Sequence, residues 1–341
     1  MSAMPSREIR LRSRPEGMPA PGNFELGESQ VAEPGPGQMR IRNIWMTVDP
    51  YMRGRMVDRR SYVPPFQIGQ PLDGGAVGEV VDSRVEGFAP GDYVVGPSGG
   101  WREVHLTDGR GFRKVDPAIA PLQTFLGTLG MPGLTAYVGL TRIGEAKAGE
   151  TVFVTAASGA VGTVACQIAR NRGCRVVGSA GSDEKTAWLL EEARIDAAIN
   201  YRKTGDLQAA MAQACPKGID VYFENVGGAH LRAALNLANP FGRLVMCGMI
   251  EQYNEAVPPP GPDNLILVIG KSLRMQGFIV SNHGDMAEDF LREMAGWIAE
   301  GRMTWQETVV EGLERAPEAF LGLFTGANTG KMLVRVGPDR S

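Results

Sequence analysis

The chain has 341 residues, of which 43% are hydrophobic and 21% charged, and its formal net charge is −3. This length favours two domains, and the nearly balanced charge gives no reason to expect a nucleic acid or an acidic membrane as a partner. No segment is apolar over the length that a bilayer requires, and the N-terminal residues contain no secretory signal. We therefore expect a cytoplasmic protein.

Short apolar runs separated by glycine and proline occupy residues 1–125. They include residues 39–48, 74–82 and 91–96. Apolar runs of this length between turn-forming residues are typical of β-strands. We expect a small all-β domain in this part of the chain.

From about residue 126, apolar strand patterns alternate with helical patterns. The expected strands are residues 151–157, 174–180, 196–201, 220–226 and 243–250. The expected helices are residues 161–173, 184–195, 207–215, 230–238 and 286–301. This alternation predicts an α/β fold with a doubly wound parallel sheet. A last expected strand, residues 330–336, would return to the first domain.

A glycine-rich turn, AASGAVG at residues 156–162, follows one expected strand and precedes one expected helix. Dinucleotide-binding turns require this context, because the amide groups at a helix start attract phosphate oxygens. Gly159 would allow a pyrophosphate to approach the backbone, and Gly162 would allow the helix to pack closely. Ala157 replaces the first glycine of the usual fingerprint, so a plain strand–helix turn is the alternative. The surrounding alternation favours a dinucleotide site.

The end of the second expected strand bears on the choice of dinucleotide. An NAD site places a carboxylate there, but residues 178–182 read GSAGS and contain none. Small residues leave space for a 2′-phosphate, and Lys185 would reach that phosphate as a positive charge. The pattern favours NADPH, with a solvated surface lysine as the alternative role for Lys185.

The histidines and cysteines show no spacing typical of a metal site. His105, His230 and His283 are the only histidines, and none lies near a cysteine or another histidine. The cysteines lie outside residues 1–125 and form no CxxC pair: they are Cys166, Cys174, Cys215 and Cys247. A catalytic zinc needs three protein ligands. We therefore expect no metal, and we expect the histidines to be surface or packing residues.

Motifs along nearly the whole chain resemble the medium-chain dehydrogenase/reductase superfamily. Within it, the chain is similar to the zinc-free leukotriene B4 12-hydroxydehydrogenase, prostaglandin reductase and alkenal double-bond reductase family, whose bacterial members include curcumin-type reductases. The motifs are VDPYMRGRM (48–56), GMPGLTAYVGL (130–140), AASGAVG (156–162), GSDEK (181–185), INYR (199–202), DVYFENVGG (220–228), CGMIEQYN (247–254), QGFIV (276–280) and NTGKMLV (328–334).

The resemblance implies a fold and an activity. Residues 126–301 would form a Rossmann domain, and residues 1–125, completed by residues 302–341, a GroES-like domain, with the active site in the cleft between them. The activity would be NADPH-dependent, metal-free hydride transfer to the carbon–carbon double bond of an α,β-unsaturated aldehyde or ketone.

The resemblance also implies the residues that bind NADPH. These are Gly159, Ala160, Val161 and Gly162 at the pyrophosphate, Lys185 and Tyr201 at the 2′-phosphate, Asn225 near the ribose, Cys247, Gly248 and Tyr253 along the cofactor, Phe278, Ile279 and Val280 beside the nicotinamide, and Asn328 from the C-terminal tail. One departure is visible, because Glu251 stands where the family often has serine.

Two tyrosines are candidate catalytic donors, Tyr253 after an expected strand and Tyr62 in the sequence SYVPPF. A phenol bonded to the enone oxygen binds more strongly in the transition state, when charge develops there. The alternative is that each tyrosine packs with its hydroxyl in water. Tyr51 is expected to be structural.

Two other functions and a homodimeric state also remain open. The chain would be a quinone oxidoreductase on the same fold if quinones were its better substrates, or an NADPH-binding protein with little catalysis if it had no turnover. The run SLRMQGFIV at residues 272–280 would form an edge strand able to pair in a homodimer.

Overall fold

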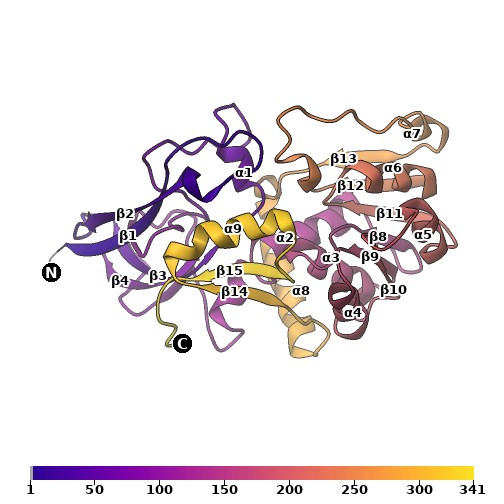
Figure 1. Cartoon of the computed structure of the whole chain (residues 1–341). Helices are drawn as coiled ribbons and strands as arrows, with labels where there is room; N and C mark the ends of the chain where they lie inside the picture. Colours follow the sequence, from indigo (N-terminus) through magenta and orange to yellow (C-terminus); the bar gives the residue numbers. More distant parts are fainter. Residues whose placement is uncertain (1–2) are drawn as a thin grey trace. The chain divides into compact units, whose positions relative to one another are not determined.

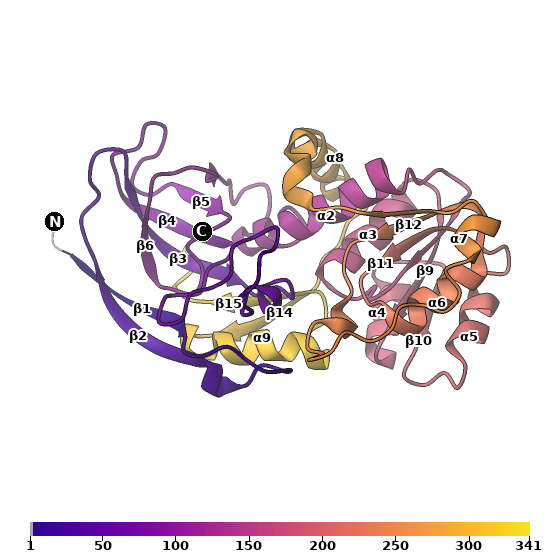
Figure 2. The same cartoon turned by 90° about the horizontal axis from the view of Figure 1, so that it is seen from above.

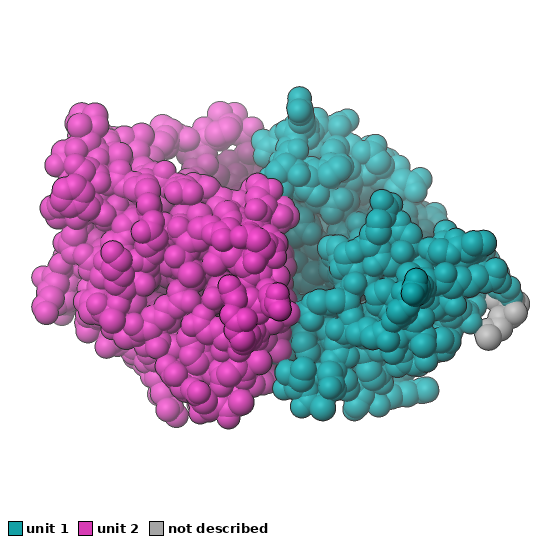
Figure 3. All heavy atoms as spheres, turned by 180° about the vertical axis from the view of Figure 1, so that it is seen from behind, with its two compact units in different colours: residues 1–126, 307–341 teal, residues 127–306 magenta. Residues whose placement is uncertain are grey.

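A computed structural model describes residues 3–341, which divide into two compact units. Unit 1 comprises Met1–Leu126 and Glu307–Ser341, and unit 2 comprises Gly127–Gln306 (Figure 3). The C-terminal residues 307–341 belong to the first unit, where residues 333–335 pair with residues 45–47. The roles of the units toward cofactor and substrate, and a cleft between them, stay predictions. Among the described residues, no helix is both long enough and apolar enough to span a membrane.

Unit 1 is built mainly from antiparallel strands. Its strands are β1 (Met4–Leu11), β2 (Phe24–Val31), β3 (Met39–Thr47), β4 (Ala76–Ser83), β5 (Tyr93–Gly96), β6 (Val104–Thr107), β7 (Arg113–Lys114), β14 (Glu307–Glu311) and β15 (Lys331–Arg335). In the described chain, β1 and β2 pair as a hairpin sheet, and a second sheet has the order β14-β15-β3-β4-β5-β7, with β6 paired to β3. The strand β15 is antiparallel to β3.

The core of unit 1 lies between these sheets and two helices, α1 (Met52–Arg55) and α9 (Ala316–Thr325). Trp101 is fully buried and stacks on Phe24, and Phe320 of α9 packs edge-on against both rings. The C-terminal helix is therefore part of the core that the N-terminal strands form.

Unit 2 contains a parallel sheet. Its strands are β8 (Thr151–Val154), β9 (Arg175–Ala180), β10 (Ala197–Asn200), β11 (Ile219–Glu224), β12 (Ala238–Met246) and β13 (Arg274–Gly277). Within the described residues their order is β10-β9-β8-β11-β12-β13, and every neighbouring pair is parallel. The predicted α/β class is confirmed, and so is β13 as an edge strand.

Helices precede, connect and follow these strands. They are α2 (Met131–Val138), α3 (Ala160–Asn171), α4 (Asp183–Glu191), α5 (Leu207–Ala214), α6 (Gly228–Leu237), α7 (Leu267–Gly270) and α8 (Ala287–Ala299). α2 packs on α3 and α5 packs on α6, and the two pairs lie on opposite faces of the sheet (Figures 1 and 2). Both faces of a parallel sheet are covered in this way, which explains its continuous apolar strands.

Three expected strands are too long by more than one residue at their carboxyl ends, because β8 ends at Val154, β11 at Glu224 and β12 at Met246. The difference is largest for β12, since residues 243–250 were expected to be extended. The amides of Cys247 and Gly248 both donate to the carbonyl oxygen of Glu224, each at 3.0 Å. Because two successive amides turn toward one acceptor, the ladder cannot continue, and the chain leaves the sheet at this point.

Candidate functional site

The strand order of unit 2 reverses between β8 and β11. From β8 the chain continues through β9 to β10 on one side, and from β11 through β12 to β13 on the other. Loops that leave the carboxyl ends of β8 and β11 therefore diverge and leave a crevice, the usual ligand position in open α/β sheets. Most of the predicted cofactor residues follow the carboxyl ends of the strands of this sheet.

The glycine-rich turn follows β8 and leads into α3. Gly159 is the residue before the helix and has no side chain to cap it, so the first amide groups remain available to an anion. A Cβ atom on Gly162 would lie 2.2 Å from the carbonyl oxygen of Ala156, whereas one on Gly159 would lie 3.2 Å from that oxygen. Only Gly162 is therefore sterically required for the close approach of helix and turn.

The departure from the usual fingerprint at Ala157 has a structural explanation. Ala157 is fully buried, and a Cβ atom on Gly178 of β9 would lie 2.6 Å from its methyl group. The missing side chain at Gly178 thus makes the space that the extra methyl group occupies. The amide of Ala157 also donates to the carbonyl oxygen of Ser179 at 2.9 Å, which holds the turn against β9.

Positive charge gathers at the carboxyl end of β9. The hydroxyl oxygen of Tyr201 and the Nε atom of Arg202 lie 3.1 Å and 3.3 Å from the position of a Cβ atom on Gly181. Burial lowers the pKa of Lys185, and the positive charge of Arg202 lowers it further. Two cations held near each other favour an anion between them. Arg202 was missed from the sequence, although it follows Tyr201 directly.

Lys185, Tyr201 and Arg202 at the end of β9 form what we call the cationic corner, and His230 packs against Tyr201 there. Its ring meets the ring of Tyr201 edge-on, with centroids 5.1 Å apart, and it is 4% exposed. Burial lowers the pKa of His230 to about 4, so the imidazole is neutral at physiological pH. The expectation of a packing role is consistent with this contact, but its partner Tyr201 was not foreseen.

Asp183, an acidic residue of this corner, is engaged elsewhere. Asp183 accepts from Asn200 Nδ2 at 2.6 Å and pairs with Lys203, and these contacts lower its pKa. Ser182 caps α4 by accepting from the amide of Lys185 at 3.3 Å. The carboxylate nearest to the end of β9 is therefore neutralised, and the corner favours a negatively charged ligand.

Asn225, Gly248 and Tyr253 lie together after β11 and β12. Asn225 Nδ2 donates to the carbonyl oxygen of Thr155 at 2.7 Å, and its own carbonyl accepts from the amide of Ile250 at 3.1 Å. The hydroxyl of Tyr253 accepts from the amide of Met249 at 3.4 Å and lies 3.1 Å from the position of a Cβ atom on Gly248. An accepting phenol keeps its own proton to donate.

Cys247 and the segment Phe278–Val280 are all partly buried, in different surroundings. Burial raises the pKa of Cys247 to about 12, and the charge of Glu224 adds to this, so the thiol stays protonated and is no nucleophile. Phe278, which follows β13, lies 3.2 Å from the position of a Cβ atom on Gly139, beside Phe223 of β11. Phe278, Ile279 and Val280 follow the carboxyl end of β13, at the same edge of the sheet as the loops after β8 and β11.

The remaining predicted residues belong to unit 1. Tyr62 is 60% exposed on a loop. Tyr51 is partly buried, and burial, followed by the charge of Asp49, raises the pKa of its hydroxyl. Tyr62 also acts on Tyr51 electrostatically, so the two phenols are neighbours. Asn328 precedes β15 and donates to the carbonyl oxygen of Gly330 at 2.8 Å, and its role toward a cofactor stays a prediction.

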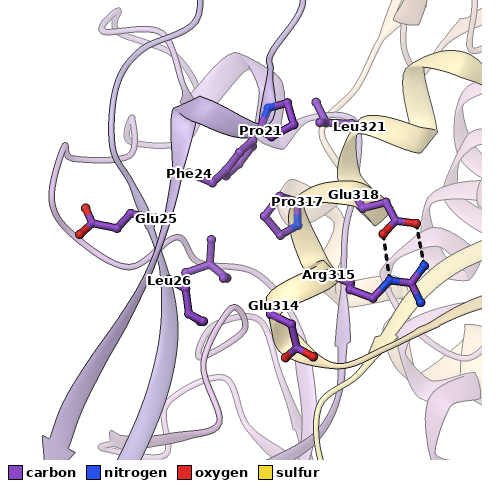
Figure 4. Close-up of a pocket in the computed structure, with 10 residues that line it drawn as sticks. Pro21, Phe24, Glu25, Leu26, Glu314, Arg315, Pro317, Glu318 and Leu321 are labelled. Carbon is purple, nitrogen blue, oxygen red and sulfur yellow. Dashed lines mark hydrogen bonds and ion pairs between the residues drawn. The ribbon is translucent and has the colours of Figure 1, made fainter.

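Two further features bear on the location of the site. In residues 3–341, no group of three or more His, Cys, Asp or Glu side chains is arranged to hold a metal ion. A cavity of about 400 Å³ lies in unit 1 between the start of β2 and the first turn of α9 (Figure 4), where Arg315 and Glu318 pair. Its lining contains no residue predicted to bind cofactor or substrate, so the candidate site stays at the sheet edge of unit 2.

Comparisons with known proteins agree with this location. Residues 7–115 match a family model described as the N-terminal domain of oxidoreductase, and residues 160–296 match one described as zinc-binding dehydrogenase. The second match begins at Ala160, within the glycine turn, and covers the cationic corner and Tyr253.

Similar proteins cover nearly the whole chain. The NADPH-dependent curcumin reductase of Escherichia coli is 44% identical over 98% of both chains. The 2-alkenal reductase (NADP(+)-dependent) of Nicotiana tabacum is 40% identical, also over 98% of both chains. The crystal structure of CurA in complex with NADPH from Vibrio vulnificus superposes with a TM-score of 0.92, at 40% identity, over 98% of this chain and 100% of that one.

Proposed function

Because the chain belongs to the medium-chain dehydrogenase/reductase family, among its NADP-dependent double-bond reductases, we propose that it reduces the carbon–carbon double bond of α,β-unsaturated aldehydes and ketones. The observation that carries the proposal is the sheet edge of unit 2, where a phosphate-binding turn, a cationic corner and a phenol follow neighbouring strands. Relatives named for curcumin and for 2-alkenals share this enone chemistry.

The residues of unit 2 fit NADPH. The uncapped start of α3 with Gly159, Ala160, Val161 and Gly162 suits a pyrophosphate, because no side chain fills the turn. Lys185, Tyr201 and Arg202 suit a 2′-phosphate, because two cations and a phenol gather there. Asn225, Cys247 and Gly248 would contact the ribose, and Phe278, Ile279, Val280 and Asn328 the nicotinamide.

Bound NADPH supplies the hydride, which adds to the β carbon of the enone. Tyr253 donates a hydrogen bond either to the carbonyl oxygen or to the nicotinamide ribose. A donor to that oxygen stabilises the charge developing on it. The proton for the α carbon comes from water, so the reaction needs no acid of tuned pKa and no metal ion.

A second phenol would come from unit 1. Tyr62 was the candidate from the sequence, but it is 60% exposed and lies beside Tyr51, which is partly buried. A phenol that is better shielded from water donates in a less polar environment, where a hydrogen bond to an anion is stronger. We therefore place Tyr51 beside Tyr62 as a candidate for the second donor.

The role of Tyr253 is tested by Tyr253→Phe with Tyr62→Phe and Tyr51→Phe as comparisons. Loss of a donor to an oxyanion typically costs a factor of roughly a hundred to a thousand in turnover, and a wetter site gives less. We expect Tyr253→Phe to lower kcat for an enone with NADPH binding nearly unchanged. Full activity would move the donor to Tyr51 or Tyr62, and loss of NADPH binding would make Tyr253 a cofactor-positioning residue.

The substrate class is tested by NADPH consumption against a panel of enones, quinones and simple alcohols. Turnover of enones above quinones is expected. Better turnover of quinones would favour a quinone oxidoreductase, and NADPH binding without turnover a binding protein. Activity lost on chelation and restored by zinc would contradict metal-free chemistry.

We also propose a homodimer formed through unit 2. The edge strand β13 has one unpaired side, and Phe241, Ile266 and Ile269 nearby are each more than 70% exposed. The amide of Phe241 donates to the carbonyl of Lys271 at 2.8 Å, which brings these segments together. Exposed apolar side chains gathered beside an open strand favour a second copy of the chain.

Light scattering at several concentrations tests the dimer. A dimeric mass is expected, and Ile266→Lys combined with Ile269→Lys should shift the protein toward monomer. A monomeric mass at every concentration would contradict the proposal.

We place the protein in the cytoplasm, because its four cysteines are free thiols.

A further inference from the structure

Glu224, the last residue of β11, carries a fully buried carboxylate. Its Oε1 atom accepts from Thr155 Oγ1 at 2.9 Å and from the amide of Val226 at 2.7 Å, and its Oε2 atom accepts from the hydroxyl of Tyr222 at 2.8 Å. Within residues 3–341 no salt bridge includes Glu224. Neutral donors alone therefore satisfy this charge.

The same residue joins three loops of the candidate cofactor site. Its hydrogen bond from Thr155 holds the residue directly before the glycine turn. The amide of Asn225 donates to the same Thr155 Oγ1 atom at 2.7 Å, which joins the loop after β11 to that turn. Its carbonyl oxygen accepts from the amides of Cys247 and Gly248 at 3.0 Å. The loops after β8, β11 and β12 thus depend on one side chain and its backbone.

We propose that Glu224 is a positioning residue of the cofactor site, whose carboxylate holds Thr155 and Asn225 in the arrangement that binds NADPH. The inference rests on the proposed function, since Asn225 is assigned to the cofactor there. Glu224 itself lies behind the loops and is not a catalytic residue.

The chemistry of the donors explains why the position carries a carboxylate. An ionised carboxylate offers acceptor sites and no donor, so it binds two hydroxyls and backbone amides at once. The hydroxyl of Thr155, once it has donated to Glu224, has its oxygen lone pairs directed toward the amide of Asn225. Burial raises the pKa of Glu224, and the amides of Val226 and Gly227 counter that effect. Without an acceptor at Glu224, the Thr155 hydroxyl would turn to the backbone carbonyl oxygen of Phe223, its other acceptor at 3.2 Å, and its lone pairs would shift away from the amide of Asn225.

The experiment compares Glu224→Met, Glu224→Gln and Thr155→Val in the full-length protein. Methionine fills the space without accepting, and glutamine keeps one oxygen acceptor. We expect the dissociation constant of NADPH, measured by calorimetry, to rise roughly tenfold or more in Glu224→Met, because buried donors lose their partners. Glutamine should restore most of the affinity, and kcat at saturating NADPH should change less than the affinity.

Hydrogen exchange of the protein without NADPH gives a second readout. The amides of Asn225 and Val226 should exchange faster in Glu224→Met, and that of Asn225 faster in Thr155→Val. Thr155→Val keeps the side-chain size, so it remains informative if Glu224→Met fails to fold. Glu150→Met is the matched control, because Glu150 lies at the amino end of β8 and pairs with Arg243. Its NADPH affinity should stay at the wild-type value.

The outcomes separate this inference from the proposed function. Wild-type protein that does not bind NADPH would overturn the proposed function. Wild-type binding that Glu224→Met and Thr155→Val leave unchanged would overturn the positioning role alone. An equal loss of affinity in Glu150→Met would also overturn it, because general destabilisation would then explain the effect.

Discussion

Each unit buries a carboxylate, and the groups that satisfy it differ. In unit 1, Asp49 Oδ1 lies 2.6 Å from Lys331 Nζ, and both side chains are less than 10% exposed. In unit 2, the donors to the Glu224 carboxylate are neutral, and they come from β11 itself and from the loops after β8 and β11. The Asp49–Lys331 pair joins segments that are 282 residues apart. The hydrogen bonds of Glu224 hold the loops at one edge of a sheet. The difference suggests that Asp49 chiefly serves stability and Glu224 chiefly serves ligand binding.

The largest effect should follow removal of the cation in unit 1. Lys331→Met leaves Asp49 buried without its counter-charge, although Thr47 Oγ1 still donates to it. Breaking a buried pair from one side costs about 3–5 kcal/mol of unfolding free energy. Urea denaturation measures this loss. Asp49→Asn added to Lys331→Met should recover much of it, and a loss below 1 kcal/mol in the single variant would contradict the account.

The exposed pair Arg292–Asp289 provides the control for that variant. Its side chains are 71% and 60% exposed, so Arg292→Ala should change the unfolding free energy by less than about 1 kcal/mol. Equal losses in Lys331→Met and Arg292→Ala would mean that burial does not distinguish the two pairs.

The next effect concerns the glycine turn of unit 2. Gly162→Ala places a methyl group 2.2 Å from the carbonyl oxygen of Ala156, and overpacking of this kind costs about 1–3 kcal/mol. Gly159→Ala meets the same oxygen at 3.2 Å and should be better tolerated in stability. Thermal unfolding of both variants checks the order. A Gly159→Ala protein less stable than Gly162→Ala would contradict the geometry.

Loss of a cation from the corner after β9 should change cofactor choice and leave stability nearly unchanged. Lys185→Ala and Arg202→Ala should each cost about 1–3 kcal/mol of NADPH binding, because each removes a charged partner of the 2′-phosphate. NADH, which lacks this phosphate, should bind nearly as before. Calorimetry with both cofactors measures the difference, and equal losses for NADPH and NADH would contradict the assignment.

Each unit also buries a neutral histidine, which gives the smallest predicted effect. Burial, with a contribution from the charge of Arg102, lowers the pKa of His105 to about 3, and burial lowers that of His230 to about 4. The unfolded chain takes up these protons near pH 6.5 and the folded chain does not, so stability falls as the pH falls below 6.5. Each histidine contributes about 1.4 kcal/mol per pH unit well inside that window.

His230→Phe keeps a ring beside Tyr201 and removes one titrating group. The unfolding free energy, measured in urea between pH 4.5 and 5.5, should then depend less steeply on pH, by about 1.4 kcal/mol per unit. An unchanged slope would show that His230 is protonated in the folded protein.

Local patterns predicted the parts of the site that depend on near neighbours. The turn at residues 156–162 could be recognised because strand, glycines and helix are consecutive, and Gly162 is the position that admits no Cβ atom. The end of β12 was misplaced, because the acceptor that turns Cys247 and Gly248 out of the sheet is Glu224, more than twenty residues earlier.

Contacts between distant segments could not be predicted in this way. Glu224 and Thr155 are 69 residues apart, and the ring of His230, on α6, meets that of Tyr201, which follows β10. No spacing rule connects such pairs, because strand order brings them together. Arg202 is a different case, since a cation directly after Tyr201 was visible, and its position over Gly181 needed the fold.

The central claim is that NADPH delivers hydride to the carbon–carbon double bond of an enone. The most direct measurement uses NADPH carrying deuterium at the transferred position, with an unsaturated ketone as substrate and mass and NMR analysis of the product. We expect a saturated ketone with deuterium on the β carbon. Deuterium on the carbonyl carbon of an alcohol product would contradict the claim.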